Sequence, residues 1–223
     1  MKTLKKILQV LVTISTPFIF LMFAVRVMLT PLFLQVEYNL PGFPADPYGF
    51  TREQRLYFSK ISVDYLLNNE GIEFLQNQKI DEGTPLYNAR ELSHMLDVKI
   101  LVKNMLAAWS GLLLIWLLLL VLAWRGKWLL DFLLAVSNGG WLTLGLILFL
   151  LTAVLVDFDG LFTAFHHLFF EGDTWLFYYS DSLIRLFPMR FWRDAFILTG
   201  GITILLALIS ALSRKGLLTK KAA

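Results

Sequence analysis

The chain has 223 residues, of which 57% are hydrophobic, 15% are aromatic and only 17% are charged. Soluble domains carry about 25% charged residues, so the composition excludes an ordinary soluble domain and indicates an integral membrane protein. There is no cysteine, which excludes disulfides, thiolate nucleophiles and cysteine-based metal sites. The net charge is +3, but the excess lies at the two ends and in one short loop, a pattern of membrane topology and not of nucleic-acid binding.

The N-terminal segment predicts a first membrane span. Lys2, Lys5 and Lys6 precede an apolar run over residues 7–29, which is too long for the core of a signal peptide and has no cleavage pattern of small residues at its end. We therefore expect a transmembrane helix that is retained. Arg26 lies near its far end, where its long side chain can reach the interface.

Residues 30–104 have nearly balanced charges, as expected of a folded extramembrane subdomain. Residues 31–39 alternate weakly between apolar and polar side chains, which predicts a short strand. Thr51 and Gln54 match the capping-box pattern, so we expect a helix from Arg52 to Leu67.

Three further spans are predicted at residues 105–124, 139–156 and 195–212. The first of these carries no charge, and its length is about what roughly 30 Å of hydrocarbon requires. The predicted fold class is an all-α integral membrane protein, a single membrane domain over residues 1–223 with four transmembrane helices and a mainly helical extracytoplasmic subdomain.

The distribution of Lys and Arg predicts the topology. Positive residues lie before the first span, in the short loop at 125–138 and after the last span. The positive-inside rule then places both termini and that short loop in the cytoplasm, and the loops at 30–104 and 157–194 outside.

The stretch at residues 86–99, LYNARELSHMLDVK, concentrates charge just before an apolar run. If it is helical, Arg90, His94 and Asp97 share one face, with Glu91 adjacent to it. Acidic and basic neighbours can tune an imidazole to titrate near neutral pH, so His94 is a candidate acid/base group.

A second candidate lies in the Phe-rich segment after the third span. His166 is followed by His167 and is one helical turn from phenylalanines in both directions. His94 comes 11 residues before the second span and His166 comes 10 after the third, which places both imidazoles at about 15 Å beyond the span ends if the helices run straight. The phenylalanines favour a lower position, in an interfacial or re-entrant helix.

Structural interpretations compete with these functional ones. A histidine near a membrane surface is more often structural than catalytic, and Asp157 and Asp159 are more simply N-caps of the Phe-rich segment. Trp175 belongs to a set of aromatic residues typical of an interfacial belt. Arg185 could meet lipid phosphates or only cap the outer surface.

A metal site is a further alternative. His94 and His166 with Asp97 or Glu91 could supply ligands, but nothing in their spacing demands a metal, so a metal-free acid/base site is favoured. The spans carry almost no charge beyond Arg26, which argues against an ion pathway or a transporter.

Three motifs carry a resemblance to a known family. They are L-Y-N-A-R-E-L-S-H-M-L-D-V-K at 86–99, F-x-x-F-H-x-x-F-F from Phe162 to Phe170, and D-x-L-I-R-L-F-P from Asp181 to Pro188. With the four-span layout, they resemble the lipoprotein intramolecular transacylase (Lit) family of Gram-positive bacteria over nearly the whole chain.

The resemblance implies an enzyme of the bacterial cell membrane with its active site at the extracytoplasmic face. Such an enzyme moves the sn-2 acyl chain of a diacylglyceryl lipoprotein to the α-amino group of its N-terminal cysteine and leaves the lyso-form lipoprotein. The implied partners are these lipoproteins and membrane lipids, with no nucleic acid and no cofactor or metal.

Carried over by motif, His94 and His166 are the catalytic residues, whereas His167 has no counterpart. We expect His166 to be the base and His94, held by Glu91 or Asp97, to orient the substrate and stabilise the oxyanion, or the reverse. Tyr87, Asn88 and Arg90 are further oxyanion candidates by proximity in sequence. Contacts to substrate or lipid are expected from Phe165, Phe169, Trp175 and Arg185.

Two other functions fit the same residues. The histidine pair could serve a different outer-leaflet acyltransferase or lipid hydrolase that acts on phospholipid. Alternatively, the chain could be a non-catalytic lipid-binding membrane subunit in which the aromatic residues and arginines matter and the histidines do not.

Overall fold

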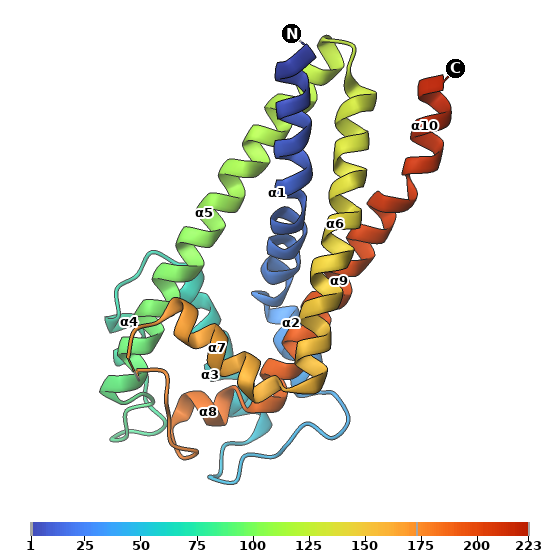
Figure 1. Ribbon diagram of the computed structural model, residues 1–223. Coiled ribbons are helices and arrows are strands. Elements are labelled where there is room, and N and C mark those ends of the chain that lie inside the picture. Colours follow the sequence, from blue (N-terminus) through green and yellow to red (C-terminus); the bar gives the residue numbers. More distant parts are fainter. Residues whose placement is uncertain (1, 173, 223) are drawn as a thin grey trace. The chain divides into compact units, whose positions relative to one another are not determined.

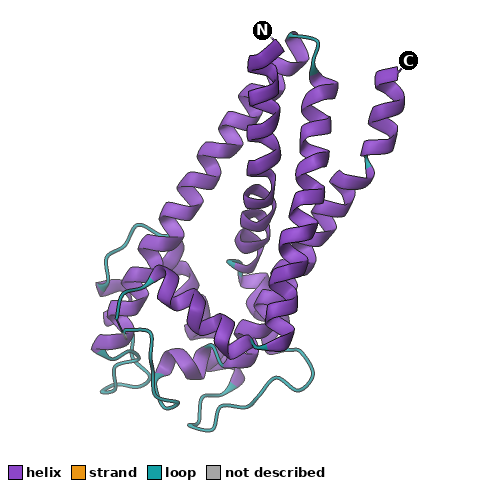
Figure 2. Ribbon diagram, viewed as in Figure 1, coloured by secondary structure: helices purple, strands orange, loops and turns teal. Residues whose placement is uncertain are grey.

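The computed structural model describes residues 2–172 and 174–222, and this part of the chain is mostly helical, with long loops between some of the helices (Figures 1 and 2). The helices are α1 (Lys2–Met28), α2 (Pro31–Tyr38), α3 (Arg52–Leu67), α4 (Glu73–Gln76), α5 (Ala89–Arg125), α6 (Leu129–Val156), α7 (Phe158–Phe169), α8 (Ser182–Leu186), α9 (Met189–Leu212) and α10 (Arg214–Ala222). The β pairing seen in the described residues is one isolated bridge between Lys79 and Pro85. The all-α class predicted from the sequence is confirmed.

Four helices are long and apolar enough to cross a membrane: Thr3–Met28, Ala89–Arg125, Leu129–Val156 and Met189–Thr219. At 1.5 Å per residue, the 37 residues of α5 extend about 55 Å, well beyond the roughly 30 Å of hydrocarbon. The first turns of α5 carry the charged residues of the 86–99 stretch, and residues up to Met105 belong to the extramembrane unit. The apolar part of α5 that follows remains the predicted span.

The chain divides into two compact units, and one of them is the membrane unit. It comprises the chain up to Arg26, residues 106–155 and the chain from Ile197 onward. Side-chain hydroxyls link its helices: Thr13 on α1 donates to the Ala135 carbonyl of α6 at 2.9 Å, and Ser210 on α9 donates to the Val136 carbonyl of α6 at 2.9 Å. Such hydrogen bonds and close packing hold helices together where lipid supplies no hydrophobic driving force.

Helix α6 is continuous from Leu129, ten residues before the predicted start of the third span. The Gly139–Gly140 pair lies inside it. Gly139 faces Thr16 of α1, and Gly140 faces the backbone of α9 at Ala207. A helix satisfies its own backbone polar groups in lipid, and glycine lets neighbouring helices approach closely, so this pair is a packing site and not a helix end.

The second unit comprises residues 27–105 and 156–196, nearly all of which the sequence predicts outside the membrane, and we call it the extramembrane unit. Its core is a cluster of aromatic and aliphatic side chains that includes Phe33, Leu34, Tyr38, Phe58, Tyr65, Leu75, Leu86, Tyr87, Met95, Leu186 and Phe191. Helices α2, α4 and α8 pack against α3. The predicted helix from Arg52 to Leu67 is confirmed, because Thr51 accepts from the Gln54 amide and Gln54 accepts from the Thr51 amide.

The short strand predicted at residues 31–39 is wrong, because this segment forms α2. Thr30 caps its N-terminus by accepting from the Phe33 amide, and Pro31 occupies the first helical position, where proline is well tolerated. The buried residues Phe33, Leu34, Glu37 and Tyr38 then follow a helical and not a two-residue period.

Gly139→Ala tests the glycine contact in the membrane unit. A Cβ there would overlap the side chain of Thr16, and we expect a destabilisation of about 1–3 kcal/mol, typical of overpacking. Thermal unfolding in detergent measures it. The matched control is Gly145→Ala on the same helix, where an added Cβ meets nothing within 4 Å. Equal melting temperatures for the two variants would contradict the packing role.

Candidate active site

His94 lies in the second turn of α5, whose start is fixed by two side chains. The Asn88 side-chain oxygen accepts from the backbone amides of Arg90 and Glu91, each at 3.0 Å. In return, Glu91 Oε2 accepts from the Asn88 amide at 2.8 Å. This reciprocal cap satisfies amides that would otherwise lack partners at a helix start. His94 follows one turn later and is 8% exposed.

His166 lies on α7, which begins with Asp157 accepting from the Gly160 amide at 2.9 Å. This confirms the N-cap interpretation of Asp157. His166 is the buried residue of this helix, also 8% exposed. Its Nδ1 is 2.7 Å from the Phe162 carbonyl oxygen. A carbonyl can only accept, so Nδ1 donates and Nε2 carries the lone pair of the neutral ring.

The structure brings the two histidines together within the extramembrane unit. Their ring centroids are 6.1 Å apart with an interplanar angle of 26°. Phe170 contacts both rings, with centroid distances of 5.1 Å to His94 and 5.7 Å to His166. Trp175 stacks on His166 at 4.7 Å, and Phe177 meets His94 edge-on at 5.3 Å. The two imidazoles therefore share one aromatic pocket.

Burial sets the protonation of this pair. Burial, together with the smaller effect of the neighbouring His166, lowers the pKa of His94 to about 4. Burial also lowers the pKa of His166, although its hydrogen bond to the Phe162 carbonyl acts in the opposite direction. Removing an imidazolium from water disfavours the charged form. Both rings are therefore neutral near pH 7 and free to accept a proton.

The expectation that Glu91 or Asp97 holds His94 is corrected by the geometry. Glu91 is 1% exposed, and its second oxygen, Oε1, accepts from the Leu183 amide at 2.7 Å. Both of its oxygens are thus committed to backbone amides, one at its own helix start, as in a capping box, and one on α8. Asp97 makes no hydrogen bond or ion pair with a described residue. His94 Nδ1 is buried without a hydrogen-bond partner in the described part of the chain.

Glu91 is a positioning residue. Burial raises the pKa of its carboxyl to about 6, and the amides of Asn88 and Leu183 counteract that rise.

Asp181 makes a second connection between the start of α5 and the segment before α8, which the sequence did not reveal. Its two oxygens accept from the Asn88 side chain at 3.0 Å and from the Tyr178 amide at 2.8 Å. Arg90 lies 3.6 Å from Asp181, and its guanidinium covers the Tyr178 ring. The first and third motifs are therefore joined.

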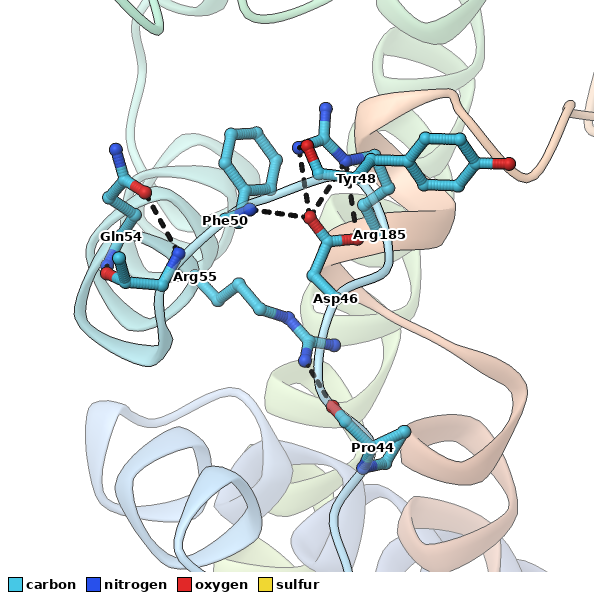
Figure 3. A network of polar contacts seen from close by, with 8 residues as sticks. Pro44, Asp46, Tyr48, Phe50, Gln54, Arg55 and Arg185 are labelled. Atoms are coloured by element: carbon cyan, nitrogen blue, oxygen red, sulfur yellow. Dashed lines mark hydrogen bonds and ion pairs between the residues drawn. The ribbon is translucent and has the colours of Figure 1, made fainter.

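Tyr87 and Arg185 are also held in structural contacts. The Tyr87 hydroxyl bonds to Ser62 Oγ at 2.6 Å, and burial raises the pKa of the phenol. Arg185 makes a two-point ion pair with Asp46, at 2.9 and 3.1 Å, and lies over the Phe50 ring (Figure 3). The Asp46 side chain is fully buried. This guanidinium fixes the loop before α3, so its expected role as a lipid-phosphate ligand has no support in the geometry.

The remaining site candidates divide by exposure. Trp175 is 8% exposed and forms the wall over His166, and its indole N–H donates to the Gly172 carbonyl. Phe165 and Phe169 are 37% and 38% exposed and contact each other at 4.9 Å. His167 is exposed and meets only the edge of Trp175. The described residues bring no three His, Asp or Glu side chains together as a metal site.

The fold and the site define a class of protein: a multi-pass helical membrane protein with two neutral histidines in an aromatic extramembrane pocket. A model of the family "Lipoprotein intramolecular transacylase Lit" matches residues 10–192. The chain therefore belongs to the Lit family, and it is a membrane acyltransferase of the lipoprotein intramolecular transacylase type.

The relatives agree in length and architecture. An uncharacterized protein of Aquifex aeolicus is 28% identical over 219 residues, which cover 98% of this chain and 97% of that one. The in meso structure of the transacylase Lit from Bacillus cereus matches with a TM-score of 0.81 at 18% identity, over 100% of this chain and 99% of that one. A His-to-Arg variant of the same protein gives 0.74 at 19% identity, with 99% and 95% covered. These two structures share the fold of this chain.

Glu91→Ala tests the positioning role. It leaves the buried Leu183 amide without its acceptor and removes the cap from the amide of the exposed residue Asn88, so we expect a loss of about 1–3 kcal/mol of unfolding free energy. Asp97→Ala, on the same helix and without a partner, should change it by less than about 0.5 kcal/mol. Chemical or thermal unfolding in detergent compares the two. If Glu91→Ala were as stable as the control, the carboxylate would not be holding the two motifs together.

Proposed function

We propose that this chain transfers the sn-2 acyl chain of a diacylglyceryl lipoprotein to the α-amino group of its N-terminal cysteine, with His94 and His166 as the catalytic residues. The pocket that holds the two neutral imidazoles side by side is the observation that carries the proposal. Family membership supports a lipoprotein as the substrate.

The first step is loss of a proton from the substrate α-ammonium group. An α-amino group has a pKa of about 7.7–8.0, so it is mostly protonated at pH 7 and cannot attack. His166 is suited to accept this proton because its Nδ1 is bound to the Phe162 carbonyl and its Nε2 lone pair is free. Its walls of Phe162 and Trp175 keep the neutral form favoured before the transfer.

The amine then attacks the carbonyl carbon of the sn-2 ester and gives a tetrahedral intermediate with one negative oxygen. His94 is placed to donate to that oxygen, because its buried Nδ1 has no protein partner among the described residues. Such an unpaired polar atom is costly unless a substrate supplies the missing partner. A neutral imidazole keeps one ring N–H, so His94 can donate a hydrogen bond without being charged. A donor in a water-poor pocket stabilises an oxyanion strongly.

Collapse of the intermediate breaks the bond between the carbonyl carbon and the glycerol oxygen. The first proton that His166 took passes to water, and the neutral ring then takes one of the two protons on the attacking nitrogen and delivers it to that oxygen, which becomes the free sn-2 hydroxyl of the lyso product. The acyl chain remains on nitrogen as an amide. Nucleophile and ester belong to one molecule, so holding them in a reactive geometry supplies much of the acceleration without an enzyme nucleophile.

The proposed topology follows from the distribution of positive charge. Both termini and the basic turn between α5 and α6 lie in the cytoplasm, and the extramembrane unit with the histidine pair faces outward. The substrate then reaches the site from the outer leaflet of a bacterial membrane, and membrane lipids are its surroundings.

Separate substitution of the three histidines tests the catalytic assignment. We expect His94→Ala and His166→Ala each to lower lyso-form production by about 10²–10⁴-fold, the range for loss of an acid/base group. His167→Ala is the matched control, because this neighbour is exposed and outside the pair. Mass spectrometry of lipoprotein N-terminal peptides from cells that express each variant gives the product ratio. Full activity in both pair variants would reject histidine catalysis.

The pH dependence of the rate tests the protonation of the pair. Burial lowers the pKa of both imidazoles below the usual value of about 6.5. The fall in kcat on acidification should therefore begin below about pH 6.5, as the base becomes protonated. Initial rates on a synthetic diacylglyceryl lipopeptide in mixed micelles, from pH 4.5 to 8, give the profile. An acidic inflection at pH 7 or above that does not follow the pKa of the substrate α-amino group would show that the base is a group other than these two histidines.

A further inference from the structure

Helix α7 carries an apolar face that the described residues cover only in part, with Phe165 meeting the Phe196 ring edge-on at 6.0 Å. Leu168 is 74% exposed, and Phe165 and Phe169 are 37% and 38% exposed. With 100° between successive residues, Leu161 joins them on the same side of the helix. This face, defined by Leu161, Phe165, Leu168 and Phe169, bears no charge.

The other side chains of α7 either pack against the protein or face water. Phe162 and His166 point into the aromatic pocket, as their ring contacts show. Asp159, Thr163 and His167 form an exposed polar strip on the side away from Leu168. The helix is therefore amphipathic on its outer surface, with one apolar side and one polar side.

The chain connection places the start of α7 at the membrane surface. Helix α6 is one of the four helices able to cross a membrane, and it ends at Val156. Helix α7 begins at Phe158, so only Asp157 separates the two. A helix that emerges so directly from a span begins at the interface, and an uncharged apolar face at that depth meets acyl chains.

We propose that the apolar face of α7 lies against the acyl chains at the outer edge of the bilayer and sets the depth of His166. A helix with its side chains is about 10–12 Å across, and interfacial helices bury their apolar faces by about 5–10 Å. His166, on the inward side of the helix, then stands in the ester and headgroup layer. If the proposed reaction is correct, the sn-2 ester reaches the base without leaving the membrane.

Spin labels at single cysteines test this docking. The chain has no cysteine, so Leu168→Cys and Thr163→Cys each provide one labelling site, on the apolar face and on the polar strip. The labelled protein is placed in vesicles of phosphatidylethanolamine and phosphatidylglycerol. We expect the label at 168 to be relaxed more by oxygen, which partitions into lipid, than by a water-soluble nickel chelate. The label at 163 should show the opposite order.

Two results would overturn the proposal. Preferential relaxation of the 168 label by the nickel chelate would place this face in water. Protection of that label from both reagents would mean that a protein surface, such as a second copy of the chain, covers it. Phe165→Cys gives a second site on the same face should Leu168→Cys fail to fold by circular dichroism. The readout needs no catalysis, so its outcome is separate from that of the acyl-transfer proposal.

Discussion

The buried carboxylate of Glu91 joins two parts of the chain that lie 92 residues apart. One oxygen closes the start of α5 through the Asn88 amide, and the other accepts from the Leu183 amide at α8. Asp181, next to that junction, also holds Asn88 and the Tyr178 amide. These contacts fix the segment that carries Trp175 and Phe177 beside the helix that carries His94. The buried Leu183 amide without its acceptor would cost about 1–3 kcal/mol, so the arrangement is firmly specified.

The pocket built on this junction favours neutral imidazoles by removing them from water. A carboxylate beside His94 would stabilise its charged form, and the structure instead directs Glu91 to backbone amides. His166 is oriented by the Phe162 carbonyl, which also fixes its tautomer. Aromatic side chains and one carbonyl thus orient the imidazole, as a carboxylate does in a Ser-His-Asp triad. In that triad the histidine must become charged in order to activate an enzyme nucleophile. An intramolecular acyl transfer has no such nucleophile to activate, and it needs only a base and a donor.

Features governed by local sequence could be predicted, whereas those governed by distant partners could not. The spans follow from hydropathy, and the caps of α3 and α7 follow from residues three positions apart. The histidine pair was expected because both rings lie at similar distances from the spans. The strand predicted at 31–39 was wrong because weak alternation was given more weight than the cap at Thr30 and Pro31. The partners of Glu91 and Arg185 were missed because they lie about 90 and 140 residues away. No pattern within a short window records such contacts.

A crossover experiment tests the central claim most directly. Two diacylglyceryl lipopeptides with different peptide sequences, one carrying a ¹³C-labelled chain at sn-2 only, are mixed and incubated with the purified protein. Tandem mass spectrometry then locates the label. Transfer within one molecule from sn-2 to the α-amine predicts labelled amide only on the labelled peptide, with its total mass unchanged. Labelled amide on the other peptide, released fatty acid or an unlabelled amide on the labelled peptide would contradict it.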